Sequence, residues 1–156
     1  ISVFAARSGA RGLAVDLNEA AVENTRANLR LHGLAEQVEV RHGDLFEGIE
    51  GCFDLVIANL PFMKDRAEDI VARAIFDETL DTWRRFFEGV GERLGPAGSI
   101  LTVLPNFCAF REILDLAETH GFRWEHLRSV HEEWMEFASF RLSPGRSQDT
   151  ASERAL

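Results

Sequence analysis

Cysteine and long apolar runs are both scarce in this sequence of 156 residues. Only Cys52 and Cys108 are present, and neither lies in a metal-ligand spacing. This excludes a disulfide-stapled scaffold and a zinc cluster, so we expect a cytoplasmic protein with no metal site. No apolar run approaches the roughly 20 residues that a membrane span needs, and the opening has no signal-peptide pattern. We therefore expect no membrane partner.

Positive charge is scarce as well, and the formal net charge is -9. A strongly acidic balance disfavours broad binding to a phosphate backbone, which usually needs a basic face. The sequence still allows a local basic patch around Arg84 and Arg85. What the chain does have is 46% hydrophobic residues and the length of about one domain, enough to bury a real core. It contains no internal repeat.

The most informative stretch is a buried-type strand that ends in an amide. Leu55–Ala58 is apolar without alternation, which is typical of a strand covered on both faces in a parallel sheet. Asn59 follows directly, where α/β sheets bind ligands. Pro61 keeps Leu60 extended, so its carbonyl is free to point outward. Two oxygen acceptors beside the ring of Phe62 fit a planar group that carries an NH2.

The remaining pattern predicts alternating helices and strands. Expected helices cover residues 1–7, 19–31, 67–94 (with a break near 77) and 107–119, with Asn18 and Asn106 as N-caps of the second and fourth. Expected strands cover residues 12–17, 37–41, 53–58, 99–104, 122–130 and 135–142. This order predicts an α/β, Rossmann-like, doubly wound and mostly parallel sheet with a C-terminal antiparallel hairpin. One domain is expected over residues 1–142, followed by a polar tail over 143–156.

Several motifs in this order carry a resemblance to a known family. The motifs are Ala14-Val15-Asp16-Leu17-Asn18, Asn24 with Asn28, Gly33-Leu34, Gly43-Asp44 and Asn59-Leu60-Pro61-Phe62. Together they resemble the class I S-adenosylmethionine (SAM)-dependent methyltransferases, and within them the amino-methylating group. The run from Asp16 to Leu34 is most similar to release-factor glutamine and ribosomal-RNA guanine methyltransferases. Leu60 stands where proline is commoner, but Asn-Leu-Pro-aromatic is also the form of ribosomal-RNA adenine dimethylases.

The resemblance also implies something that the sequence lacks. Such enzymes begin with a strand and a glycine-rich loop that holds the methionine end of the cofactor. Here Gly9 and Gly12 come after the first expected helix, and no strand precedes it. We therefore expect the chain to be N-terminally incomplete and to bind the cofactor poorly or not at all, and we expect added upstream residues to restore binding.

The resemblance assigns a role to each candidate residue. Asp16 would accept hydrogen bonds from the ribose hydroxyls of SAM, with Leu17 beside it; the alternative is a solvated or capping carboxylate. Asp44 would accept from the adenine amino group, with Leu45 beside the ring; the alternative is a plain turn.

For the catalytic end of the site, the resemblance implies a grip on the acceptor nitrogen. Asn59 and the Leu60 carbonyl would hold the substrate NH2, Pro61 would fix the segment, and Phe62 would stack on the planar group. Asn59 also counts as a cofactor contact. The alternative is a strand-ending turn with a buried Phe62. Two acceptors on an amine or amide favour the positive charge that develops at nitrogen, and no covalent participant is required.

Three functions remain open from the sequence. The first is a SAM-dependent methyltransferase that acts on an amino or amide nitrogen of a protein, RNA or small-molecule acceptor. The second is an NAD-dependent dehydrogenase, which shares the strand-end acid but leaves residues 59–62 unexplained. The third is a non-catalytic fragment. The sequence leaves the acceptor and the oligomeric state undetermined. Pro105-Asn106-Phe107 stands where glutamine-methylating enzymes usually have an acid and Gln.

Overall fold

The computed structural model describes residues 1–145. The chain divides into two compact units, Ile1–Ile49 and Glu50–Leu156, and each is described by itself. Residues 146–156 of the expected polar tail lie outside the described residues, whereas Ser143 and Pro144 belong to the last strand.

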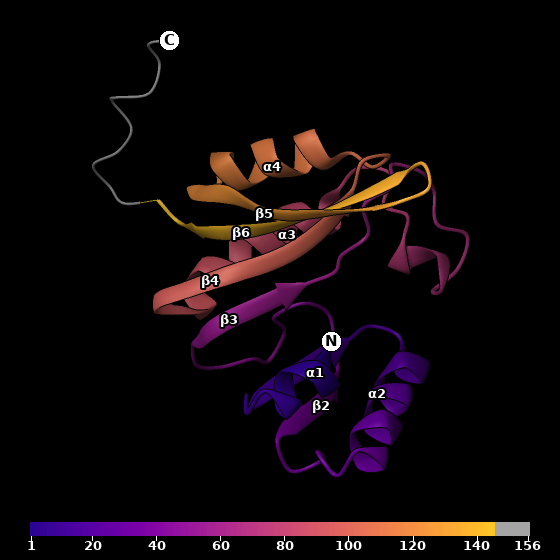
Figure 1. Cartoon of the computed structure of the whole chain (residues 1–156), viewed down its shortest axis with the longest axis vertical. Coiled ribbons are helices and arrows are strands. Elements are labelled where there is room, and N and C mark those ends of the chain that lie inside the picture. Colours follow the sequence, from indigo (N-terminus) through magenta and orange to yellow (C-terminus); the bar gives the residue numbers. More distant parts are fainter. Residues whose placement is uncertain (146–156) are drawn as a thin grey trace. The chain divides into compact units, whose positions relative to one another are not determined.

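The elements alternate along the chain as an α/β fold does (Figure 1). The helices and 3-10 turns are α1 (Ser2–Arg7), α2 (Glu19–Leu31), η1 (Ala72–Ala74), α3 (Asp81–Val90), η2 (Gly91–Arg93) and α4 (Phe110–Thr119). The strands are β1 (Gly12–Asp16), β2 (Val38–His42), β3 (Phe53–Ala58), β4 (Leu94–Pro105), β5 (Phe122–Glu132) and β6 (Met135–Pro144).

The strands form a parallel pair in the first unit and a mixed sheet in the second. β1 pairs with β2 in parallel, and the second sheet has the order β3-β4-β6-β5. In that sheet β3 and β4 are parallel, while β4–β6 and β5–β6 are antiparallel. The expected α/β class and the C-terminal antiparallel hairpin are therefore confirmed.

The helix ends of the first unit form as their sequence dictates. The Asn18 side chain accepts a hydrogen bond from the backbone N–H of Ala20 at 3.0 Å, so the expected cap of α2 is confirmed. At its other end Gly33 adopts φ +68 and donates to the Arg30 carbonyl. Leu34 then donates to the Leu29 carbonyl at 2.9 Å, which completes a Schellman motif.

The first unit is small but has its own apolar core. Leu29 and Leu34, brought together by the Schellman motif, pack with Ala6 of α1 and Val38 of β2. Ala14 of β1 also lies against this cluster. This packing holds α2 against the β1–β2 pair.

In the second unit, α3 and α4 supply most of the core. Trp83, Phe86, Phe87 and Val90 recur at helical spacing and are all buried, so they form one apolar stripe along α3. From α4, Ile113, Leu114 and Ala117 are buried as well. Figure 1 shows α4 lying along the β5–β6 hairpin.

Two expected helices begin later than their sequence pattern predicted. Within residues 67–94 only α3 is an α-helix, and the part before it is irregular apart from η1. The expected break is at Asp77, whose carboxylate accepts from the N–H groups of Thr79 and Thr82. In the fourth helix the first residue is Phe110, not Phe107. Asn106 does not cap it, because its backbone and side chain both bond to Glu136 of β6.

The expectation that β3 is covered on both faces was wrong for the described residues. Leu55 and Ile57 are 45% and 40% exposed, whereas Ala58 is buried. Alternate residues of a strand point to opposite faces. One face of β3 is therefore covered within the described residues and the other is open.

Candidate functional site

The first group of candidate residues lies where β1 and β2 end. The two strands are parallel, and Asp16 is in register with His42, so both carboxyl ends meet at one edge. The N–H of Gly43 donates to the Asp16 carbonyl at 3.1 Å and continues the pairing beyond the last strand residue. His42 Nε2 lies 2.9 Å from the Leu17 carbonyl, which ties the loop after β1 to the end of β2.

Asp16 presents an exposed carboxylate at this edge. Its Oδ1 accepts a hydrogen bond from the Asn18 N–H at 2.8 Å, so one oxygen orders the turn into α2. This is the capping arrangement that the sequence left open as an alternative. Within residues 1–145 no hydrogen bond reaches Oδ2, so Asp16 retains an oxygen that can accept from a ligand hydroxyl. Leu17 beside it is 40% exposed and offers an apolar surface.

Asp44 and Leu45 lie in the loop that follows β2. Both are half-buried, and the Asp44 carbonyl accepts from the N–H of Glu47 at 3.0 Å, which makes a turn. Leu45 adopts φ +49, a left-handed conformation that a leucine rarely takes. The loop is thus a defined turn that holds Leu45 in a strained backbone conformation next to Asp44.

The second group of candidate residues follows β3 in the other unit. Asn59 is exposed, Leu60 and Phe62 are half-buried, and Pro61 is buried. Within residues 1–145, neither the Asn59 side chain nor the Leu60 carbonyl takes part in a hydrogen bond. The segment is therefore accessible, and its two expected acceptors are available.

The backbone of this segment is held from three sides. The indole N–H of Trp83, whose side chain is fully buried, donates to the Pro61 carbonyl at 2.8 Å. The N–H of Phe62 donates to the Ile75 carbonyl at 3.0 Å, and the Phe62 carbonyl accepts from Ala109 at 3.3 Å. These bonds fix the two residues that follow Leu60, Pro61 and Phe62.

The sequence alone does not predict the bond between Trp83 and Pro61. The two residues are 22 positions apart, and helical spacing shows only that the ring faces inward. The one available signal was chemical, because a buried indole N–H needs a carbonyl partner.

A set of four aromatic residues, here named the ring cluster, adjoins the segment. It consists of Phe62, Phe107, Trp134 and Phe137. Phe107 contacts each of the other three, with ring centroids 6.3 Å from Phe62, 5.8 Å from Trp134 and 6.4 Å from Phe137. The sequence left the role of Trp134 open, and it is 70% exposed at the tip of the hairpin.

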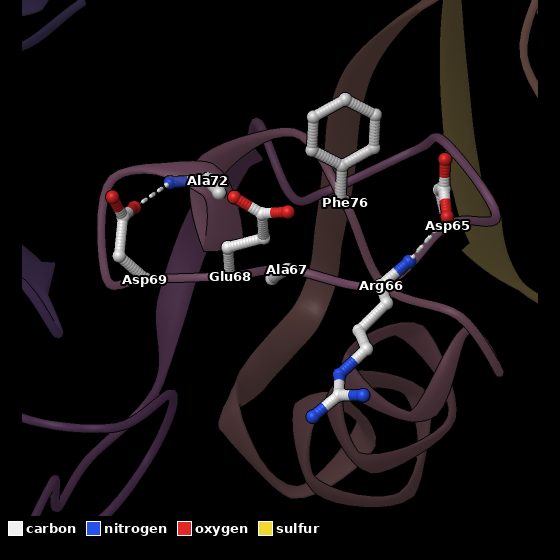
Figure 2. Close-up of a pocket in the computed structure, with 7 residues that line it drawn as sticks. All are labelled: Asp65, Arg66, Ala67, Glu68, Asp69, Ala72 and Phe76. Carbon is white, nitrogen blue, oxygen red and sulfur yellow. Dashed lines mark hydrogen bonds between the residues drawn. The ribbon is translucent and has the colours of Figure 1, made fainter.

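A hollow of about 650 Å³ lies in the loop after this segment, lined by Asp65, Arg66, Ala67, Glu68, Asp69, Ala72 and Phe76. Figure 2 shows two of its carboxylates bonded locally, Asp65 to the N–H of Arg66 and Asp69 to that of Ala72. The Arg66 guanidinium points away from the other side chains in the same view. None of the expected site residues lines this hollow, so it does not belong to either group.

Cys108 lies between β4 and α4. Its burial raises the pKa of the thiol to about 11, against the opposing effect of backbone hydrogen bonds. A thiol with this pKa is protonated at neutral pH and is a weak nucleophile. No cluster of three metal-binding side chains occurs among the described residues. No helix in the described part of the chain is long and apolar enough to cross a membrane.

Comparison with known proteins gives a family. Residues 1–122 match the family described as MTS, Methyltransferase small domain. The ribosomal protein L11 methyltransferase of Exiguobacterium sp. is 46% identical over 61 residues, which are 38% of this chain and 20% of that protein. The ribosomal protein uL3 glutamine methyltransferase of Neisseria meningitidis is 28% identical over 114 residues, 67% of this chain and 37% of that protein.

The fold matches solved structures. The 16S rRNA N2 G1207 methyltransferase of T. thermophilus, solved in complex with AdoMet and guanosine, has a TM-score of 0.63 and 22% identity. The match covers 90% of this chain and 33% of that one. The fold is therefore that of Rossmann-like methyltransferases, and the chain spans well under half the length of these relatives.

Proposed function

Because the chain belongs to the methyltransferase small domain family, we propose that it acts as a SAM-dependent methyltransferase on an amino or amide nitrogen. One observation carries this proposal. The Asn59 side chain and the Leu60 carbonyl have no hydrogen bond within residues 1–145, while their neighbours are held by Trp83, Ile75 and Ala109. Two acceptors on a rigid segment suit the capture of an NH2 group.

The chemistry follows from where charge develops. The lone pair of an amide or aromatic amine is delocalised, so the nitrogen is a poor nucleophile. Acceptors at Asn59 and Leu60 withdraw its hydrogens from the plane and stabilise the positive charge that grows at nitrogen. Because the backbone that follows the Leu60 carbonyl is held before the substrate binds, that oxygen needs little reorganisation during the reaction. Phe62 supplies an apolar edge for the planar group.

The cofactor roles fall to the first unit. When bound, SAM would supply an electrophilic methyl group; the sulfonium leaves as a neutral thioether, and the methylated nitrogen loses one N–H proton to water. Asp16 retains an oxygen for the ribose hydroxyls, and Leu17 offers exposed apolar surface. We assign Asp44 to the adenine amino group and Leu45 to the face of the ring. These residues orient the nucleoside, and none of them takes a proton.

The acceptor belongs to the classes on which relatives act. The names of the two curated relatives specify ribosomal proteins, and one of them specifies glutamine. The solved relative is named for a guanine of ribosomal RNA. We therefore propose a protein or RNA acceptor and a cytoplasmic setting.

Calorimetry with SAM and with NAD tests the cofactor assignment. We expect the chain to bind SAM and not NAD. Asp16→Asn is expected to lower SAM affinity about tenfold, the loss of one charge-assisted hydrogen bond. The matched control is Asp115→Asn, the same change at an exposed position of α4, which should leave the affinity unchanged. Binding of NAD in place of SAM would contradict the proposal.

Transfer of a labelled methyl group tests the catalytic assignment. The assay supplies labelled SAM and ribosomal protein and RNA fractions to the chain and its variants. Asn59→Ala is expected to lower kcat by about 100-fold, the order seen when one preorganised polar contact is removed. Asp115→Ala, at an exposed position of α4, is the control. Equal rates for wild type and Asn59→Ala would refute the role of Asn59.

A further inference from the structure

We propose that the tip of the β5–β6 hairpin binds a basic polypeptide that carries the methyl acceptor, an inference that rests on the proposed function. The docking surface consists of Phe107, Val130, Glu132, Glu133 and Trp134. It is assembled from the loop after β4, from the end of β5 and from the turn that joins β5 to β6.

The ring cluster connects this surface to residues 59–62, the segment proposed to hold the substrate nitrogen. Phe62, three residues after Asn59, contacts Phe107 at 6.3 Å, and Phe107 contacts Trp134 at 5.8 Å. All of these residues belong to the second unit. A chain that lies across Trp134 and Phe107 therefore passes directly beside the segment where the nitrogen would be held.

The apolar part of the surface is unusually open. Trp134 is 70% exposed, Val130 45% and Phe107 41%. Single exposed apolar side chains are ordinary, but adjoining ones beside a candidate site mark an interaction surface. Tryptophan is also the residue that most often carries binding energy at interfaces.

The carboxylates next to Trp134 determine which sign of charge a partner of this surface must carry. In the hairpin register Glu132 pairs with Met135 and Val130 pairs with Phe137, so Glu132 lies on the face of the ring cluster. Glu133 is in the connecting turn. Glu136 pairs with His131 and lies on the opposite face, so it is not part of the surface. Within residues 1–145 neither Glu132 nor Glu133 has an ion-pair partner.

The surface is held in place. The Asn106 N–H donates to the Glu136 carbonyl at 2.8 Å, and the Glu136 N–H donates to Asn106 Oδ1 at 3.3 Å. These two bonds fasten the hairpin to the end of β4 just before Phe107. The rings of Phe107 and Trp134 are thus positioned before a partner binds, which lowers the entropy lost on binding.

Charge decides between a polypeptide and a nucleic acid. An exposed indole can stack on a base or on an arginine guanidinium. Glu132 and Glu133 repel phosphates and attract lysine and arginine, and the net charge of -9 acts in the same direction. The combination of open rings and unpaired carboxylates therefore fits an arginine- and lysine-rich segment.

Fluorescence anisotropy with a labelled Arg/Lys-rich peptide containing one glutamine tests this directly. We expect saturable binding that weakens with salt. Trp134→Ala should reduce affinity about tenfold, the effect of losing a central aromatic contact, and Trp134→Phe should recover part of it. The double change Glu132→Gln and Glu133→Gln should reduce affinity about threefold and flatten the salt dependence. A labelled single-stranded oligouridylate should bind more weakly than the peptide.

Glu88→Gln combined with Glu92→Gln, which removes the same two charges at exposed positions of α3 and η2, is the control and should leave peptide affinity unchanged. Circular dichroism checks that each variant is folded. Equal peptide affinity for folded Trp134→Ala and wild type overturns the proposal, and so does tighter binding of oligouridylate that Trp134→Ala weakens. The peptide assay needs no cofactor. Binding of NAD in place of SAM therefore contradicts the proposed function separately from the docking surface.

Discussion

At the scale of single residues, Gly98 of β4 lies too close to neighbouring backbone atoms to carry a side chain. A Cβ there would lie 2.8 Å from the Phe53 carbonyl oxygen and 2.9 Å from the Gly95 nitrogen, and neither atom can rotate away. We expect Gly98→Ala to lower the free energy of unfolding by about 1–3 kcal/mol. Gly91→Ala, where nothing lies within 4 Å, is the control in urea denaturation. Equal midpoints for both variants would show that the β3–β4 contact relaxes.

Thr102 presents the opposite case. Its hydroxyl is buried in β4 and has no hydrogen-bond partner within the described residues. Valine has the same shape without the polar atom, so Thr102→Val should raise the free energy of unfolding by about 1 kcal/mol. At Thr119 the hydroxyl donates to the Asp115 carbonyl at an exposed site, and Thr119→Val should give no gain. Thermal melts of both variants check the difference.

At the scale of elements, α3 depends on a carboxylate that precedes it. Leu80, at the N-cap position, has φ +57 and no capping side chain. Asp77 reaches past it to the N–H of Thr82 at 2.7 Å. Burial raises the pKa of Asp77, but bonds from Thr82, Asp81 and Thr79 outweigh it and lower the pKa. Asp77→Ala should therefore cost about 1 kcal/mol of unfolding free energy at neutral pH.

The same bonds set the pH dependence of α3. Because the pKa of Asp77 is lower when folded, its stabilisation is complete above the unfolded pKa and disappears as pH falls through the folded pKa. The stability difference between wild type and Asp77→Ala should thus shrink below about pH 4. Urea denaturation across the acid range measures it. A difference that is constant down to pH 2 would contradict the role of the carboxylate.

The segment after β3 depends on α3 through Trp83. Trp83→Phe keeps the ring but removes the donor to the buried Pro61 carbonyl, so it should cost about 1–3 kcal/mol of unfolding free energy. Trp124→Phe is the matched control, because its indole N–H donates to the exposed Glu118 carboxylate. Hydrogen exchange at Phe62 and Met63 should rise only in Trp83→Phe. Equal exchange rates in both variants would show that the Trp83 bond does not hold this segment.

Periodicity and capping residues predicted much of these elements. Asn18, the stripe from Trp83 to Val90 and the hairpin all have local causes, which a sequence displays. Asn106 did not cap α4, because a strand 30 residues away offered it better partners. Likewise, the apolar run of β3 predicted two covered faces, while the structure leaves Leu55 exposed. In each case the wrong prediction concerned a property that is determined by residues distant in the sequence.

The features of the candidate site likewise divide into those that the local sequence predicts and those that depend on tertiary contacts. Asp16 and Asn59 were predicted because Asp16 ends a strand and Asn59 follows one, and strand ends are local features. The support of Pro61 by Trp83 and the contact of Phe107 with Trp134 are tertiary, and spacing does not reveal them. Sequence reasoning therefore found candidate residues but not what holds them.

At the scale of the whole molecule, the two thiols of the chain differ in reactivity. Cys52 is exposed, whereas burial raises the pKa of Cys108 to about 11. Brief treatment of the folded chain with iodoacetamide near pH 7 should therefore modify one thiol, and peptide mass analysis should locate it at Cys52. Denatured chain should take up label at both. Modification of Cys108 at the same rate as Cys52 would contradict the effect of burial.

A chain with a single reactive thiol can be tethered at one position without any genetic change. A dye or a solid support attached at Cys52 would give every molecule the same orientation. Surface-based binding experiments would then start from a uniform population, because the Cys108 thiol stays protonated and does not react with the reagent.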